Sequence, residues 1–240
     1  MSRMYQYYEV DGFPELSLGQ KIEALTQHGM PGVTADQAHT SITYLGMSEH
    51  KNFSKFFVEH DAVRNLVWRA DTGDIRRGGL IEVVEFYMYR HIRDGYFFID
   101  TNHQNIQDMC KRLTKTVPKL IIRIRDVDLP ATKEELKSRV SIGYFGSLNI
   151  QQVSACAIYG PDVGESDMWE YLMKHGQLNA MTIEFEYFGE MQKVMVHRLG
   201  GIMPYHTFGE NASLDIIDEV KRLIEPLSTL NEVSLGRRRK

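Results

Sequence analysis

Two arginines occupy alternate positions in a short aliphatic run, a spacing that indicates phosphate binding. Arg123 and Arg125 alternate with Ile122 and Ile124 within residues 120–127. Because side chains alternate between the two faces of a strand, both guanidinium groups are expected on one face. A guanidinium forms two parallel hydrogen bonds to a phosphate, so this pair predicts binding of phosphate or nucleic acid.

Further cations extend this arginine cluster along the chain. Arg76, Arg77 and Arg90 are the other arginines expected to contact nucleic acid, with Tyr87 and Tyr89 as candidate stacking residues. No named nucleic-acid-binding motif accompanies them. The competing and preferred interpretation is a solvated face, in which carboxylates close in sequence neutralise the arginines: Asp71, Asp74, Asp94 and Asp126.

A second stretch with chemical potential is HTSITYLG at residues 39–46. It resembles the first signature of the two-histidine phosphoesterases, in which His, any residue, Ser or Thr and an aliphatic residue precede an aromatic-Leu-Gly ending. The resemblance implies that His39 acts as general acid or base on a phosphodiester and that the Ser41 hydroxyl holds the phosphate. On a strand, these two residues share a face.

The sequence departs from this family at the second motif. The family needs a second His-x-Ser/Thr on a partner strand, because the acid and the base act on opposite sides of the phosphorus. His197 is followed by Arg198 and Leu199, and the spacing after His206 is also wrong. The competing and preferred interpretation is a structural strand with an exposed histidine at its start.

No metal and no cofactor are expected. Neither Asp100 with His103 nor His60 with Asp61 has the spacing of a metal-ligand motif. The glycine pairs at 78–79 and 200–201 do not open a helix in a phosphate-binding loop pattern. Two cysteines, Cys110 and Cys156, do not form a CxxC motif. Cys110 falls at a core position of a predicted helix.

Composition describes an ordinary globular chain. It has 240 residues, 42% of them hydrophobic and 25% charged, with a formal net charge of −4. This charge excludes a protein whose whole surface binds nucleic acid, but leaves room for a local basic patch. Residues 1–10 lack an apolar segment, so no signal peptide is expected. No run approaches the roughly 20 apolar residues of a membrane helix, and a cytoplasmic location is expected.

Helices and strands are predicted from capping residues and from the periodicity of apolar positions. In the first third we expect a strand at 6–10, a helix from Ser17 through Leu25, a strand at 40–45, a helix capped by Asn52 and a loop at 70–79. Beyond it we expect strands at 80–91, 95–101, 120–127, 140–145 and 153–159, and helices at 103–117, from Thr132, at 166–175 and from Ser213 to 227.

The best-patterned segment is a hairpin around Gly189. Apolar and polar residues alternate from Met181 to Tyr187, as in a half-buried strand. A two-residue turn at Gly189 and Glu190 predicts three cross-strand pairs: Phe185 with Val194, Ile183 with Val196, and Glu186 with Lys193.

These patterns predict an α+β fold of mixed or antiparallel sheets with short covering helices, in one or two closely packed subdomains. The expected regions are residues 1–75, 76–230 (strand–helix units 80–138 and 140–227) and a basic flexible tail at 231–240.

The function predicted from the sequence is that of a non-catalytic interaction subunit. It is expected to bind a partner protein or a second copy of itself, with nucleic acid as a further candidate ligand of the arginine-bearing strand face. The alternative is a phosphodiesterase-like enzyme that uses His39 and Ser41.

Overall fold

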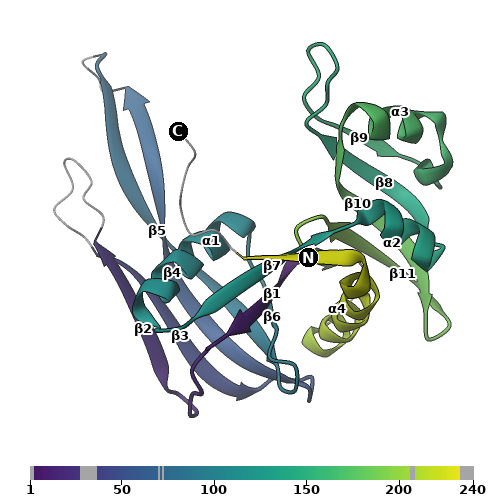
Figure 1. The fold of residues 1–240 in the computed structure, drawn as a ribbon. Helices are drawn as coiled ribbons and strands as arrows, with labels where there is room; N and C mark the ends of the chain where they lie inside the picture. The colour runs from purple at the N-terminus through teal and green to yellow at the C-terminus, as the bar shows by residue number, and fades with distance from the viewer. Residues whose placement is uncertain (1–2, 28–36, 70, 72, 206–208, 233–240) are drawn as a thin grey trace. The chain divides into compact units, whose positions relative to one another are not determined.

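The computed structural model describes residues 3–27, 37–69, 71, 73–205 and 209–232. The fold is of the α+β class, as predicted, and combines long antiparallel strands with short helices (Figure 1). The chain divides into two compact units, which are described separately. Unit 1 contains Met1–Glu9 and Arg123–Val233, and unit 2 contains Val10–Ile122.

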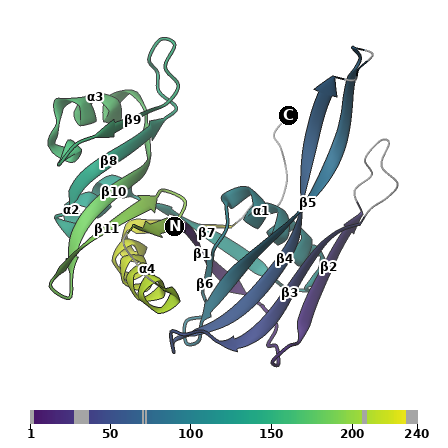
Figure 2. The same cartoon turned by 180° about the vertical axis from the view of Figure 1, so that it is seen from behind.

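Unit 2 is built around five strands in the order β2-β3-β4-β5-β6, with antiparallel neighbours. Their bounds are β2 Lys21–Gln27, β3 Gln37–Met47, β4 Phe53–Arg69, β5 Ile75–His91 and β6 Phe97–Ile99. One helix, α1 (His103–Thr116), packs against β2 and β4 (Figures 1 and 2).

The core of unit 2 lies between α1 and the sheet. Alternate residues of β4 are buried from Phe56 onward, as expected where one face of a strand packs on a core. Apolar residues at helical spacing on α1 meet them, namely Ile106, Met109 and Leu113. Cys110 lies in the same stripe, and burial raises the pKa of its thiol to about 12. It therefore acts as a small apolar side chain, as predicted.

Unit 1 contains strands in the order β1-β12-β11-β10-β8-β9, while β7 pairs with β1 and β13. The strands are β1 Tyr5–Asp11, β7 Ile121–Val127, β8 Arg139–Gly146, β9 Cys156–Tyr159, β10 Gln177–Tyr187, β11 Glu190–His197, β12 Gly201–Pro204 and β13 Ser228–Glu232. The helices are α2 Leu129–Leu136, α3 Asp167–His175 and α4 Glu210–Ile224, with 3-10 turns at Val163–Glu165 and Glu225–Leu227. The chain passes between the units within β1 and within β7.

In the core of unit 1, α4 packs against β12, which pairs with β11 of the β10–β11 hairpin. Ile183 and Val194 are fully buried partners on adjacent strands. On α4 the apolar residues at helical spacing, Ile217, Val220 and Ile224, have no solvent exposure.

Most elements beyond residue 80 are confirmed. The hairpin of β5 and β6, the helix α1 after its cap Asn102, the strands β7 and β8, and the helix α3 after its cap Ser166 lie where the sequence predicts them. In the first third, β1 and β3 also confirm the predicted strands.

Both helices predicted in the first third are wrong. Residues 21–27 form β2 and residues 53–69 form β4. The sequence around Ile22 is rich in helix formers, but Ile22 and Ala24 are buried with period two against β3. In β4, Phe53 and Phe56 mimic a helical spacing, and tertiary pairing overrides that local preference.

The predicted loop at 70–79 is too long. Residues from Ile75 onward belong to β5, so the connection between β4 and β5 is limited to residues 70–74 of one hairpin. The predicted boundary between residues 75 and 76 falls inside this hairpin, and the two compact units meet along the chain at other positions.

Two predicted helix caps are also wrong. Asp128, rather than Thr132, caps α2, and its carboxylate accepts a hydrogen bond from the Ala131 amide at 3.0 Å. Gly209, rather than Ser213, precedes α4, which places Ser213 in the first turn. Strand β9 begins at Cys156, three residues later than predicted.

The β10–β11 hairpin is confirmed, but its predicted register is wrong by two residues. The observed pairs include Phe185 with Gln192, Ile183 with Val194 and Glu184 with Lys193. Phe188 and Gly189 form the turn with φ of 50° and 78°, the left-handed pair that a type I′ turn requires. A two-residue shift keeps each side chain on its face, which is why the buried positions were still predicted correctly.

The predicted tail at 231–240 begins inside β13, since residues 231–232 pair with β7. Residues 233–240 lie outside the described part of the chain, as does His206. Among the described helices, none has the length and apolar character that a bilayer crossing requires.

Candidate functional site

The outer half of the β4–β5 hairpin is a two-stranded ribbon that extends past the rest of its sheet. The ladder between β3 and β4 reaches only the pair of Thr40 with His60. Beyond this point residues 61–69 pair with β5 alone, and both views of the ribbon drawing show the hairpin projecting from the sheet (Figures 1 and 2).

Five β-branched aliphatic residues lie on one face of this ribbon. We call them the outer strip: Val63, Val67, Ile75, Ile81 and Val83. Directly opposite residues of an antiparallel pair share a face, and Val63 lies opposite Ile81. The other three follow at even spacing from this pair. Val67, Ile75 and Val83 are each about two thirds exposed, at 65%, 66% and 63%.

The opposite face of the ribbon points toward the helix α1. Ala62 on that face is buried, and the guanidinium of Arg64 donates to Glu82 at 3.1 Å and to Asn105 of α1 at 3.3 Å. Val67, Ile75 and Val83 therefore remain largely exposed among the described residues of unit 2. Arg77 lies opposite Val67 and Arg69 lies opposite Ile75, so arginine positions stand beside the aliphatic residues on this face. Exposed apolar side chains with polar neighbours are typical of an interaction site.

Charged side chains border the outer strip at the base of the ribbon. Glu59 lies opposite Glu85, and Asp61 lies opposite Val83, so three carboxylates share this face of the sheet. Further along the same face, Lys55 lies 4.3 Å from the ring centroid of Tyr87. An apolar centre with a charged rim is the usual anatomy of a protein–protein interface.

The predicted phosphoesterase residues lie on β3, next to this acidic base. His39 and Ser41 share a face of the strand, as expected from their spacing. The Ser41 hydroxyl donates to the Glu59 carboxylate at 3.1 Å, and Glu23 lies opposite Ser41 on the other neighbouring strand. A phosphodiester at Ser41 would meet these two carboxylates, and like charges repel.

Beneath His39, a buried arginine fixes α1 to the sheet. Arg112 is only 3% exposed and donates to the carbonyl oxygens of His39 and Asp61, at 2.9 and 2.6 Å. It also reaches the Thr40 hydroxyl and Nδ1 of His60, at 3.1 and 3.3 Å. Burial, and then the charge of Arg112, lower the pKa of His60 to about 4. This cluster holds the fold together and has no open face for a substrate.

His197, one of the two histidines considered for the second motif, belongs to unit 1. Nδ1 of His197 accepts from the Leu199 amide at 3.1 Å, which is a local turn contact. Among the described residues of unit 2, no strand beside His39 carries a second His-x-Ser/Thr motif.

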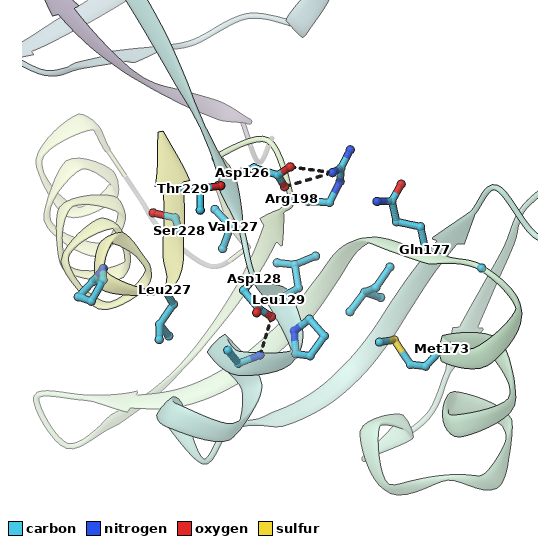
Figure 3. A pocket seen from close by; sticks show the side chains of 15 residues that line it. Asp126, Val127, Asp128, Leu129, Met173, Gln177, Arg198, Leu227, Ser228 and Thr229 are labelled. Atoms are coloured by element: carbon cyan, nitrogen blue, oxygen red, sulfur yellow. Dashed lines mark hydrogen bonds and ion pairs between the residues drawn. The ribbon is translucent and has the colours of Figure 1, made fainter. Parts of the chain in front are cut away.

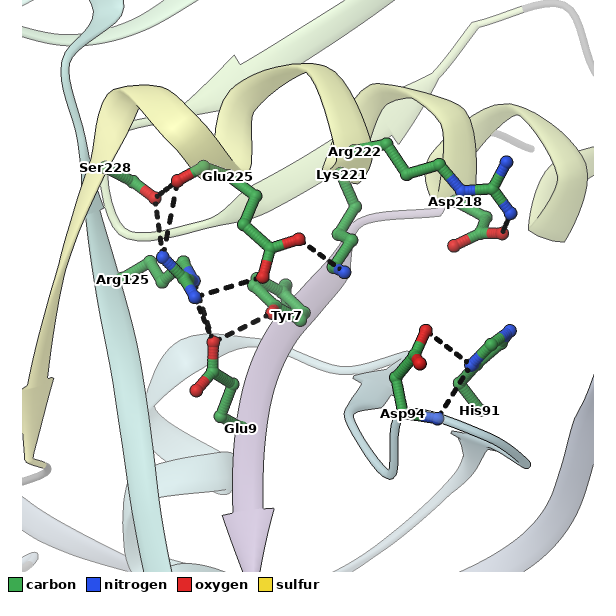
Figure 4. A network of polar contacts seen from close by, with 10 residues as sticks. All are labelled: Tyr7, Glu9, His91, Asp94, Arg125, Asp218, Lys221, Arg222, Glu225 and Ser228. Carbon is green, nitrogen blue, oxygen red and sulfur yellow. Dashed lines mark hydrogen bonds and ion pairs between the residues drawn. The ribbon is translucent and has the colours of Figure 1, made fainter.

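Arg125 is held inside unit 1 rather than presented on a phosphate-binding face (Figure 4). Its guanidinium forms ion pairs with Glu9 and Glu225 and donates to the Ser228 hydroxyl at 3.1 Å. Its side chain is 14% exposed. Burial and the adjacent Glu9 carboxylate raise the pKa of Tyr7, which donates to Glu9 at 3.1 Å.

The other arginines of the predicted cluster are distributed over both units. Arg123 lies two residues from Arg125 on β7 and is half-buried. Arg90, in unit 2, pairs with Glu15 at 2.8 Å. Arg76 and Arg77 lie on β5, and their side chains are outside the described part of the structure. The predicted carboxylate pairing is thus found for Arg90 and Arg125, with partners other than those named from the sequence.

Unit 1 also contains a groove of about 680 Å³ (Figure 3). Its floor is apolar, with Val127, Leu129 and Leu178 all nearly fully buried. On its rim the Arg198 guanidinium donates to both carboxylate oxygens of Asp126, at 3.1 and 3.0 Å. The volume suits a small ligand. Arg198 neutralises Asp126, whereas Asp128 adds a second carboxylate, so the charged side chains of the lining carry one net negative charge.

No metal site is found among the described residues, where no three His, Cys, Asp or Glu side chains come together. His60, which was considered as a metal ligand, has Nδ1 directed at the Arg112 guanidinium, a cation that would repel a metal ion. His103 lies 2.8 Å from the Gln107 side chain on the same helix.

The sequence reasoning missed the outer strip because residues 70–79 looked like a loop. Residues typical of strands were nevertheless present on either side of this predicted loop. Val63, Ile81 and Val83 are β-branched, which is typical of strands, and Ile75 stands between the charged residues Asp74 and Arg76.

The chain matches no protein-family model, and no curated protein matches its sequence.

Proposed function

We propose that this protein is a non-catalytic interaction subunit that binds a partner protein through the outer strip of the β4–β5 ribbon. The observation that supports this proposal is the set of five β-branched side chains on one face of a projecting, two-stranded ribbon whose opposite face contacts α1 at its base. An isolated hairpin is marginally stable in water, so a second surface packed on the strip would also stabilise the ribbon.

The partner surface expected from this chemistry is apolar at its centre and basic at one end. Full burial of a valine or isoleucine side chain contributes about 1.5–3 kcal/mol, and three residues of the strip are about two thirds exposed. The carboxylates at the base of the ribbon would meet lysine or arginine on the partner. Charge complementarity of this kind gives specificity and speeds association.

A protein partner is preferred over nucleic acid for this unit. Glu59, Asp61 and Glu85 border the strip, and nucleic acid carries a dense negative charge that these carboxylates repel. A further argument is that Arg90 and Arg125, two of the predicted phosphate ligands, already form ion pairs with carboxylates. We place the interaction in the cytoplasm, in line with the composition of the chain.

Site-specific photo-cross-linking would test the proposal directly. A photoreactive amino acid is placed at Val83 in the full chain, and at Leu18 as a matched control that is 75% exposed in the same unit. In cells that make the protein, we expect a discrete protein adduct from position 83 and none from position 18. The adduct should be lost in a Val67→Glu/Ile75→Glu variant, because buried charges without partners oppose binding.

The variant is expected to fold normally, since exposed substitutions usually change stability by no more than about 0.5 kcal/mol. Absence of any adduct specific to position 83 would reject the proposal. So would a salt-sensitive gel shift with DNA or RNA that disappears in the same variant, because that result would assign the ribbon to nucleic acid.

A further inference from the structure

The free end of the β10–β11 hairpin in unit 1 is a second projecting ribbon. Strand β8 pairs with β10 only as far as Glu184, and β12 pairs with β11 only from Val194. Residues 185–192 therefore pair only with each other, and in both ribbon views this hairpin extends beyond β8 (Figures 1 and 2).

Phe188 stands at the tip of this hairpin in an unfavourable conformation and environment. Its φ of 50° lies in the left-handed region, which costs a residue with a side chain about 1–2 kcal/mol. Its ring is 89% exposed and makes an edge contact with Tyr187, with ring centroids 4.5 Å apart. Asparagine or glycine would form the same type I′ turn with less strain. A bulky aromatic residue here points to a role outside the chain's own fold.

The surroundings of Phe188 are apolar next to the ring and acidic around it. Met191 is 63% exposed, while Glu186 and Glu190 are exposed beside it. The nearby cation Lys193 pairs with Glu184 at 3.3 Å. No other cation lies between residues 186 and 192, so this tip carries two unneutralised carboxylates.

We infer that Phe188 and Met191 insert into an apolar socket on a partner protein, and that lysine or arginine residues on the rim of that socket meet Glu186 and Glu190. Aromatic side chains that fill a pocket are typical hot spots of protein interfaces. The carboxylates oppose approach to anionic membranes and to nucleic acid, so charge complementarity selects a protein with a basic rim. This site is independent of the outer strip, which belongs to the other unit.

The test places a photoreactive phenylalanine analogue at position 188 of the full chain, and at Tyr159 as a control that is 68% exposed in the same unit. The expected result is an adduct with a different protein from position 188 only, mapped to an apolar site with neighbouring lysine or arginine. A Glu186→Lys/Glu190→Lys variant should lower its yield about tenfold, since like charges would then face each other.

A second variant separates binding from folding. Phe188→Asn should weaken binding of the identified partner by about 30-fold or more, as expected for loss of a hot spot. Its Tm should be unchanged or higher by about 2–4 °C, because the strain at the turn is relieved.

Three results would overturn the inference. They are equal cross-linking from positions 188 and 159, an adduct formed only with a second copy of this chain, and a yield that does not respond to charge reversal. Cosedimentation with phosphatidylserine vesicles that depends on Phe188 would also overturn it, by assigning the tip to a lipid surface. A failure at Phe188 leaves the test at Val83 unaffected, because the two cross-linking positions lie on separate hairpins.

Discussion

At the scale of single residues, the neutral ring of His60 marks the place where α1 is fixed to its sheet. Nδ1 accepts a hydrogen bond from Arg112 and lies 2.9 Å from the Thr40 hydroxyl. A guanidinium can only donate, so Nδ1 carries no proton and the neutral ring is protonated at Nε2. Nε2 is buried and has no hydrogen-bond partner among the described residues. Protonation of this ring would place a second cation against Arg112.

The stability of unit 2 should therefore fall as the pH is lowered from 6.5 toward 4. The unfolded chain binds a proton at His60 with a pKa near 6.5, whereas the folded pKa is about 4. Between these two pKa values the unfolded state binds more protons than the folded state. The free energy of unfolding therefore falls as the pH is lowered, and at pH 4.5 it is about 2–3 kcal/mol smaller than at neutral pH.

Urea unfolding at pH 7 and pH 4.5 measures this loss, with His60→Gln as the comparison. The variant removes the titrating ring and should lose less stability between the two pH values than the natural protein does. An identical pH dependence for both proteins would contradict the neutral, buried state of His60.

At the scale of elements, the sequence predicted the second half of the chain better than the first. Helix α3 has a serine cap, an apolar stripe and a closing glycine, and each of these local signals agrees with the structure. Strand β4 carries a buried histidine, His60, within its apolar series, and two neighbouring phenylalanines imitate a helix. Its conformation is decided by pairing with β3 and β5, which lie elsewhere in the sequence.

The candidate sites show the same limit of sequence-based prediction, because contacts between distant segments leave no local pattern. The shared face of His39 and Ser41 followed from strand geometry, but the carboxylate of Glu59 reaches Ser41 from another strand. The spacing of Arg123 and Arg125 was also read correctly. The partners of Arg125 are separated from it by 116 and 100 residues along the chain, a distance that no local pattern reports.

The cap of α2 provides a test at this scale. Asp128 accepts from the amide of Ala131 and precedes Pro130 in the first turn. Asp128→Ala should reduce the free energy of unfolding by about 1 kcal/mol, the usual effect of losing an N-cap. Glu134→Ala on the exposed side of the same helix is the control and should change stability by less than about 0.5 kcal/mol. Equal effects in denaturant titrations would show that the cap contributes nothing.

At the scale of the whole molecule, the order of segments along the chain differs from their grouping into units. Residues 10–122 form unit 2, and they are inserted between the two segments of unit 1. Arg125 joins those two segments, because it pairs with Glu9 from the first and with Glu225 from the second.

Arg125→Met should destabilise unit 1 by about 2 kcal/mol, since removal of one partner leaves partly buried carboxylates without a counterion. Arg125→Lys should recover little of this loss, because an ammonium cannot reproduce the forked hydrogen bonds. Fluorescence of the buried Trp169 reports unfolding of unit 1. The exposed Arg139 supplies the control variant, Arg139→Met. If both methionine variants unfold at the same urea concentration, Arg125 is not a structural residue.

The insertion of unit 2 also determines the order in which the two units become able to fold during synthesis. All of residues 10–122 leave the ribosome before most of unit 1 has been translated, so unit 2 is able to fold first. Tyr5 and Gln6 of β1 pair with Ile202 and Gly201 of β12. At ordinary translation speeds, β1 waits about 10–40 s for these partners. During that interval β7 is already available to pair with β1, but the side of β1 that later pairs with β12 is an unpaired edge, and strands of other proteins in the cell can pair with it.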